Sequence, residues 1–352
     1  MNAHEDSPPP TPTPQPAHGP FSADPRSGAV GTPPTGAAPS PRRRGPRPVP
    51  PGVPYHRVLT DEKRRVWRGV AALALLVGGL LLFSTVLTLL AVLADTLLGR
   101  TDPLSDGFEL TPLVHAANLF SLALLIPWSM LVQRWLYGIR GASLHSVRSL
   151  LRPEVVGRTL MVIVPVWAVY LTVFSALSPL PEAPWRTADL LWMFAITTVL
   201  APLQSAGEEY GLRGLAFRVA ASWGRGPRTA LVIGVLVSSL LFTALHLALD
   251  PWLNLYYLTF GVTLALITWR TGGLETAIVI HAANNTLAFL IALILRSDQV
   301  TWFDRSTGVG SALMLVPCAL LVAVTAVVWW RTRESGPALT PADPRSARPR
   351  QP

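Results

Sequence analysis

The chain has 352 residues, of which 50% are hydrophobic and only 14% are charged, with a mean hydropathy of +0.39. A water-soluble globule of this length needs more charged surface, so the composition favours an integral membrane protein. The net charge of +9 does not indicate nucleic-acid binding, because Lys and Arg lie in the tails and in alternate loops rather than on one basic face.

The first 57 residues have the composition of a disordered tail. They hold 17 of the 34 prolines and show no apolar periodicity, so they lack the side chains that would form a core. We expect residues 1–57 to be a disordered Pro- and Arg-rich tail. We expect residues 332–352, which follow the last apolar segment, to be a second disordered tail.

Eight apolar segments approach the length of about 20 residues that a helix needs to cross a hydrocarbon core about 30 Å thick. In chain order they are 66–98, 112–132, 159–177, 188–203, 229–249, 252–269, 274–295 and 309–330. We therefore predict an all-α fold, a polytopic membrane bundle of about eight transmembrane helices. The first three lie within residues 58–187, the next four within 188–295 and the last within 296–331.

Charge in the loops predicts how these segments are oriented, because Lys and Arg concentrate on the cytoplasmic side of membrane proteins. Arginines follow the second segment (Arg134, Arg140, Arg148, Arg152 and Arg158) and the fourth (Arg213, Arg218, Arg225 and Arg228). The opposite loops carry acidic residues and few arginines, so both termini are expected in the cytoplasm. The Ala-, Arg- and Pro-rich composition is typical of a high-GC bacterium, which places the protein in a bacterial plasma membrane.

Ionisable side chains at membrane depth are costly to bury, so they are candidates for function. The first cluster reads EEYGLR, residues 208–213, and directly follows the fourth segment. On a helix, Glu209 and Arg213 lie four residues apart and can pair, whereas Glu208 points about 100° away and is left without that partner. A carboxylate of this kind is a candidate general base. An ordinary ion pair on an interfacial helix is the alternative.

Two later segments each contribute a histidine. His246 ends the sequence FTALH, which begins at Phe242, and His281 begins the sequence HAANN. His281 and Asn285 are one helical turn apart and share a face. A single histidine in such a helix is more often an interhelical hydrogen-bonding group, but three helices that each bury a polar group are best explained by contact in one cavity.

In this order the motifs resemble those of the CPBP family, the CAAX proteases and bacteriocin-processing enzymes, also called the Abi family. The patterns EExxxR, FxxxH and HxxxN match Glu208, Glu209 and Arg213, then Phe242 and His246, then His281 and Asn285. The resemblance covers roughly residues 188–295, which we take as a CPBP-like catalytic core.

The resemblance implies an intramembrane glutamic endopeptidase that cleaves peptide or protein substrates at the lipid bilayer. Glu208 and His246 would position and deprotonate the attacking water, and His281 and Asn285 would stabilise the oxyanion. Glu209, Arg213 and Phe242 would support the motif helices.

Alternatives remain open. Glu208, His246 and His281 would also supply the ligands of a catalytic zinc ion. We favour a mechanism without a cofactor, because Glu208 cannot be a ligand and a free base at once. The same fold would serve a non-catalytic immunity or secretion scaffold. A proton-coupled transporter ranks last, because the two halves lack matching broken segments.

Overall fold

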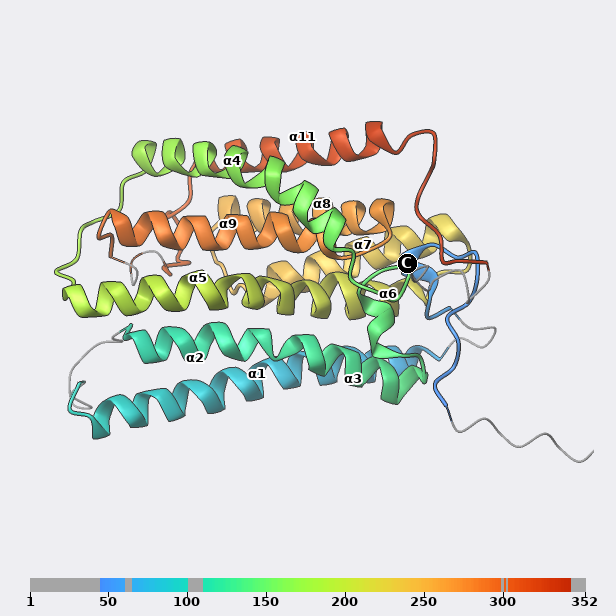
Figure 1. Cartoon of the computed structure of the whole chain (residues 1–352), viewed down its shortest axis with the longest axis horizontal. Helices are drawn as coiled ribbons and strands as arrows, with labels where there is room; N and C mark the ends of the chain where they lie inside the picture. Colours follow the sequence, from blue (N-terminus) through green and yellow to red (C-terminus); the bar gives the residue numbers. More distant parts are fainter. Residues whose placement is uncertain (1–44, 61–64, 101–109, 299–300, 302, 343–352) are drawn as a thin grey trace, which may run out of the picture. The chain divides into compact units, whose positions relative to one another are not determined.

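The structure is a computed structural model that describes residues 45–60, 65–100, 110–298, 301 and 303–342 (Figure 1). Its long elements are helices: α1 Val66–Leu97, α2 Pro112–Ala123, α3 Leu125–Tyr137, α4 Pro153–Leu177, α5 Thr187–Glu209, α6 Phe217–Ala221, α7 Pro227–Leu245, α8 Pro251–Thr271, α9 Glu275–Ile294 and α11 Leu315–Arg331. Short helical turns are η1 Tyr55–Arg57, η2 Gly141–Leu144, the π-helical η3 Tyr210–Ala216 and η4 Ala312–Met314. The predicted all-α fold is confirmed.

Eight helical segments among the described residues are long and apolar enough to cross a membrane, as the sequence predicted. They are Val66–Leu97, Pro112–Tyr137, Pro153–Leu177, Thr187–Ala221, Pro227–Leu245, Pro251–Thr271, Glu275–Ile294 and Ala312–Arg331. Large apolar side chains face outward along them, for example Leu89 at 63% exposure and Met161 at 80%. In a membrane, lipid tails cover apolar helix surfaces of this kind.

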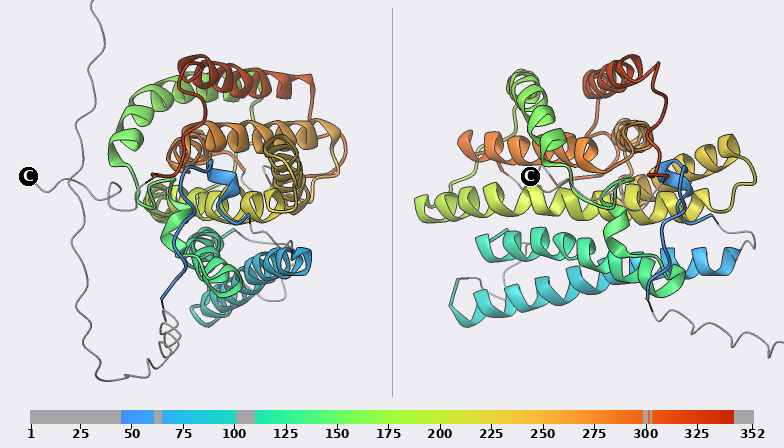
Figure 2. Two further views of the ribbon diagram at one scale, coloured as in Figure 1. Left: turned by 90° about the vertical axis from the view of Figure 1, so that its right-hand side faces the viewer. Right: turned by 45° about the vertical axis from the view of Figure 1, so that its right-hand side comes forward.

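The helices of residues 45–342 are stacked around α5 and α9. Figures 1 and 2 show α1, α2 and α3 on one side of α5, and α4 and α11 on the far side of α8 and α9. The helix pairs α5 with α9 and α2 with α5 share extensive contacts, as do α7 and α8. The two helices that carry EExxxR and HxxxN therefore lie side by side in the middle of the bundle.

The second predicted segment is divided into α2 and α3 at Leu124. Pro127 explains the division, since proline donates no backbone hydrogen bond and its ring clashes with the carbonyl four residues earlier, that of Ala123.

The fourth segment is longer than predicted. α5, η3 and α6 form one helical run over Thr187–Ala221, so EExxxR lies inside a membrane-spanning helix rather than after one.

The fifth segment is shorter than predicted. α7 ends at Leu245 rather than at residue 249, and Leu247 has a left-handed backbone with φ of +52°. Asp250 then caps α8 by accepting hydrogen bonds from two backbone N–H groups, and Pro251 is the first residue of that helix. This Asp-Pro start defines a new helix. His246 therefore lies at the C-terminal end of α7, not deep inside it.

Part of the predicted tail of residues 1–57 is packed on the helices. Residues 1–44 lie outside the described residues, but residues 45–60, here called the N-terminal strap, pack on the helices. The Tyr55 side chain is fully buried, its hydroxyl donates to the carbonyl of Leu144 at 2.5 Å, and the Arg218 guanidinium lies 3.8 Å from its ring centre. These contacts bury part of the N-terminal strap, which the composition alone did not predict.

The beginning of the second predicted tail is also packed. Thr340 is buried, and its hydroxyl accepts a hydrogen bond from the backbone N–H of Val53 at 3.0 Å. Residues 332–342 are therefore fixed to the N-terminal strap, while residues 343–352 lie outside the described residues.

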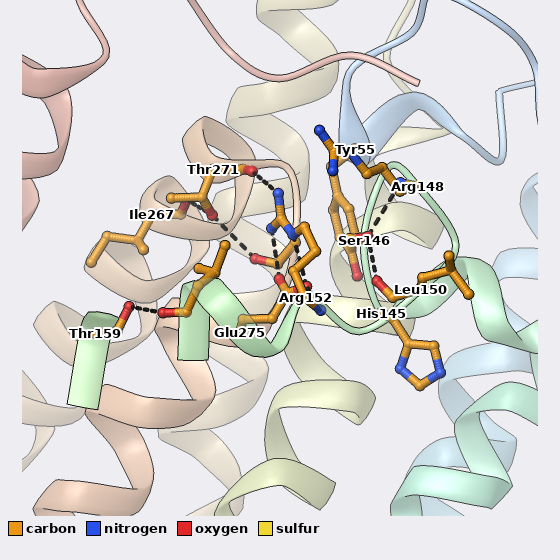
Figure 3. Close-up of polar contacts among 12 residues, drawn as sticks. Tyr55, His145, Ser146, Arg148, Leu150, Arg152, Thr159, Ile267, Thr271 and Glu275 are labelled. Carbon is orange, nitrogen blue, oxygen red and sulfur yellow. Dashed lines mark hydrogen bonds and ion pairs between the residues drawn. The ribbon is translucent and has the colours of Figure 1, made fainter. Parts of the chain in front are cut away.

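A buried ion pair fixes the start of α9 (Figure 3). Glu275, the first residue of α9, is fully buried and its carboxylate lies 2.6 Å from the Arg152 guanidinium. Arg152 also donates to the carbonyl of Thr271, at the end of α8. The loop before α4 thereby holds the turn between α8 and α9, and with it the helix that carries His281.

Candidate active site

The EExxxR motif spans the change from α5 to the π-helical η3. Glu209 and Arg213 are both fully buried, with 3.1 Å between Oε1 and Nη1, so the pair predicted from their spacing is present. Gly207 allows this segment to approach the α2–α3 junction, because a Cβ atom there would overlap the carbonyl oxygen of Leu122. Short π-helical insertions are frequent at functional sites, where they redirect side chains.

His281 of α9 faces both carboxylates of the motif. Its Nδ1 atom lies 2.7 Å from Oε1 of Glu209, a hydrogen bond, and its Nε2 atom lies 3.7 Å from Oε2 of Glu208. The second distance is too long for a direct hydrogen bond but places the two groups in ion-pair range. Glu209 therefore orients the imidazole while Glu208 faces its other nitrogen.

His246 joins this group through aromatic contacts. Its ring centre lies 4.4 Å from that of Phe242, and the centre of the Phe242 ring lies 6.1 Å from that of His281. Nδ1 of His246 lies 2.8 Å from the carbonyl oxygen of Phe242. A ring that donates Nδ1–H in this way keeps Nε2 free to accept a proton.

Phe242 also contacts the arginine of the first motif. The Arg213 guanidinium lies 4.1 Å from the Phe242 ring centre and 5.9 Å from that of Phe260. Aromatic faces stabilise a buried cation of this kind. Phe242 thus contacts both the arginine of EExxxR and the histidine of FxxxH.

Asn285 reaches Glu208 through a residue that the sequence analysis did not select. Gln204, one turn before Glu208, donates from Nε2 to Oε1 of Glu208 at 2.6 Å. Its own Oε1 accepts from Nδ2 of Asn285 at 3.1 Å. Gln204 is nearly buried and connects the expected base to an expected oxyanion residue. The i, i+4 spacing from Glu208 was the only sequence signal for it.

Tyr257 of α8 is a second residue that the sequence analysis missed. Its ring is stacked on His246, with 3.9 Å between the ring centres. Asn284 contacts two neighbouring helices, since its Oδ1 atom accepts hydrogen bonds from Nε1 of Trp167 at 3.3 Å and from the hydroxyl of Tyr256 at 3.3 Å. The four expected catalytic side chains and Tyr257 thus occupy one region between α5, α7, α8 and α9.

The residues present do not form the expected zinc alternative. Among the described residues, no group of three or more His, Cys, Asp or Glu side chains is arranged to hold a metal ion. We therefore derive no chemical step from a metal.

Residues 187–287 match the family model described as Type II CAAX prenyl endopeptidase Rce1-like, which confirms the resemblance of the motifs over that part of the chain. The chain is also similar to the uncharacterized protein YyaK of Bacillus subtilis (strain 168), with 32% identity over 123 residues. That alignment covers 33% of this chain and 39% of YyaK. No solved structure matches the chain.

Proposed function

We propose that this chain, which carries an Rce1-like domain of the type II CAAX prenyl endopeptidase family at residues 187–287, is an intramembrane endopeptidase. The observation that carries the proposal is the position of the Glu208 carboxylate, 3.7 Å from Nε2 of a buried histidine that a second carboxylate orients. Peptide hydrolysis needs such a base and nearby donors for the oxyanion.

In this proposal Glu208 and His246 hold the attacking water and take its proton. Gln204 donates to one oxygen of Glu208, which leaves the other oxygen directed toward His281. Nε2 of His246 is free to accept, because its Nδ1 faces the Phe242 carbonyl. The water oxygen then attacks the scissile carbonyl, and the proton passes to the leaving amine.

His281 and Asn285 stabilise the oxyanion in the same proposal. Asn285 donates one of its two amide hydrogens to Gln204, so the second remains for the substrate. His281 donates through Nε2 when that atom is protonated, with Nδ1 held by Glu209. Burial strengthens both hydrogen bonds, because few waters compete for the developing charge.

The substrates we propose are peptides or proteins at the membrane, cleaved near its cytoplasmic side. The loop charges support an orientation with both termini in the cytoplasm, and similarity to a Bacillus protein supports a bacterial plasma membrane. Prenylated C-terminal tails are not expected in a bacterium, so a peptide precursor is the substrate class to search for.

The test is a comparison of membrane proteomes from cells that carry the wild-type chain, E208Q or the matched control E154Q. Glu154 is exposed at the start of α4, away from the motifs. We expect an uncleaved precursor to accumulate with E208Q only, with its cleavage slowed at least about 100-fold. An E208Q protein that folds normally and leaves every peptide unchanged would favour the scaffold function instead.

A further inference from the structure

A cavity of about 160 Å³ lies where the N-terminal strap crosses the beginning of α1 and the end of α3. Three arginines line it, Arg47, Arg65 and Arg68. Hydroxyl groups line it as well, those of Thr60, Tyr137 and Ser222. None of the motif residues of the proposed active site is among the lining residues, so this cavity is a separate feature of the fold.

The lining has the chemistry of an anion site. Among the described residues, those that line the cavity include three arginines and neither Asp nor Glu. Arginine recognises phosphate through paired N–H donors, which a single point charge does not provide. The Thr60 hydroxyl is buried without a hydrogen-bond partner, so it is a further group for a ligand to satisfy. The volume is well above the ~10–15 Å³ that one water occupies, so a phosphate group fits.

The surroundings of the cavity favour a lipid over a free anion. Arg65 and Arg68 flank the first residues of α1, and the large apolar side chains beside them are exposed, Trp67 at 64% and Val70 at 55%. The Arg68 guanidinium lies 5.8 Å from the centre of the Trp67 ring. Tryptophan and arginine together are typical of the headgroup level of a membrane. A molecule with its phosphate in the cavity would therefore find an apolar helix face for its acyl chains.

We propose that this cavity binds the phosphate of an anionic phospholipid and that the bound lipid holds the N-terminal strap on α1 and α3. The strap already contacts the end of α3, since the backbone N–H of Arg47 donates to the carbonyl of Gly138, the residue after that helix, at 2.8 Å. A lipid phosphate bound by Arg65 and Arg68 at the beginning of α1, beside Thr60 of the strap, adds a second attachment. Basic pockets between membrane helices are known to bind acidic headgroups in this manner.

The test uses the full chain in a zwitterionic detergent and measures its thermal unfolding midpoint. A short-chain phosphatidylglycerol, a phosphatidylcholine of the same chain length and inorganic phosphate are added in turn. We expect phosphatidylglycerol to raise the midpoint, phosphatidylcholine to leave it unchanged and inorganic phosphate to raise it less, because ligand binding to the folded state stabilises it. Equal effects of phosphatidylglycerol and inorganic phosphate would overturn the lipid assignment.

Two charge-matched double variants locate the effect. R65Q/R68Q should lose most of the rise, whereas R134Q/R158Q, which removes two exposed arginines outside the cavity, should keep it. Equal loss in both variants would show that overall charge, not this site, attracts the lipid.

A photoactivatable phosphatidylglycerol added to the wild-type chain tests the same site without any substitution, so the result does not depend on whether a variant folds. We expect its crosslinks near Trp67 and Tyr137, and crosslinks spread evenly over all exposed helices would contradict the proposal.

Discussion

The Oε1 atom of Glu209 lies 2.7 Å from Nδ1 of His281, across the contact between α5 and α9. The same oxygen lies 3.1 Å from Nη1 of Arg213. One carboxylate thus orients an expected catalytic imidazole and neutralises a buried cation. Glu209 and Arg213 are fully buried and His281 is nearly so, which makes the group sensitive to any change in charge.

We predict that E209Q destabilises the protein strongly. The change leaves the Arg213 guanidinium buried without its ion-pair partner, which costs about 3–5 kcal/mol in comparable cases. The measurement is the thermal midpoint in detergent, with the exposed E154Q as the control. If E209Q and E154Q unfold at the same temperature, the Glu209–Arg213 pair does not carry the stability assigned to it.

Q204L should lower activity more than it lowers stability. The variant removes the Nε2 donor to Glu208, and a hydrogen bond to a charged group contributes about 1.5–3 kcal/mol, so we expect a loss of about 10-fold or more in kcat/KM. The loss should fall on kcat with an altered pH profile. T198A, which removes an exposed hydroxyl elsewhere on α5 that bonds to the carbonyl of Phe194, is the control. A loss confined to KM would assign Gln204 to substrate binding instead.

The sequence predicted the spans well because long apolar runs leave a helix across the membrane as the only arrangement that satisfies the backbone. Their ends were predicted less well. The division at Leu124 and the early end of α7 depend on Pro127 and Asp250, whose effects on a helix are local and easily lost in an apolar run. The packing of Tyr55 could not be predicted, because it depends on the distant Leu144 and Arg218.

The same distinction applies to the site. The Glu209–Arg213 pair follows from i, i+4 spacing within one helix, so the sequence was sufficient. The bond from Asn285 to Gln204 joins α9 to α5, and it depends on how those two helices are rotated against each other. The stacking of Tyr257 on His246 likewise depends on the turn between α7 and α8. The spacing of residues within one helix predicts neither the Asn285–Gln204 bond nor the stacking of Tyr257 on His246.

The Arg152–Glu275 pair predicts a specific result in a double-mutant cycle. R152M or E275M alone leaves one charge in the buried turn before α9, and each should cost about 3 kcal/mol. R152M/E275M should be more stable than the sum of the two changes indicates, because no unpaired charge remains. Unfolding midpoints of the four proteins test this. Strict additivity would show that the ion pair does not couple the two residues.

We predict from the burial of His56 that the folded protein becomes less stable in mild acid. Burial lowers the pKa of His56 from 6.5 to about 4. The unfolded chain therefore takes up this proton at a higher pH than the folded protein, and stability decreases as the pH falls from about 6.5 to about 4, by up to about 3 kcal/mol. H56F keeps an aromatic ring against Phe217 and should reduce the pH dependence between pH 7 and 5. An unchanged slope would mean that other groups cause the acid sensitivity.

Chelation should leave the proposed activity intact. The zinc alternative requires Glu208, His246 and His281 to converge on one ion, and the described residues contain no group of three such side chains arranged to do so. Glu208 instead accepts a hydrogen bond from Gln204. We expect purified protein to contain far less than one zinc per chain and to retain its cleavage rate after 1,10-phenanthroline treatment. Stoichiometric zinc that is removed together with activity, and that restores activity when it is added back, would reassign Glu208 from base to ligand, because one carboxylate cannot hold the metal and remain free to take the proton from water.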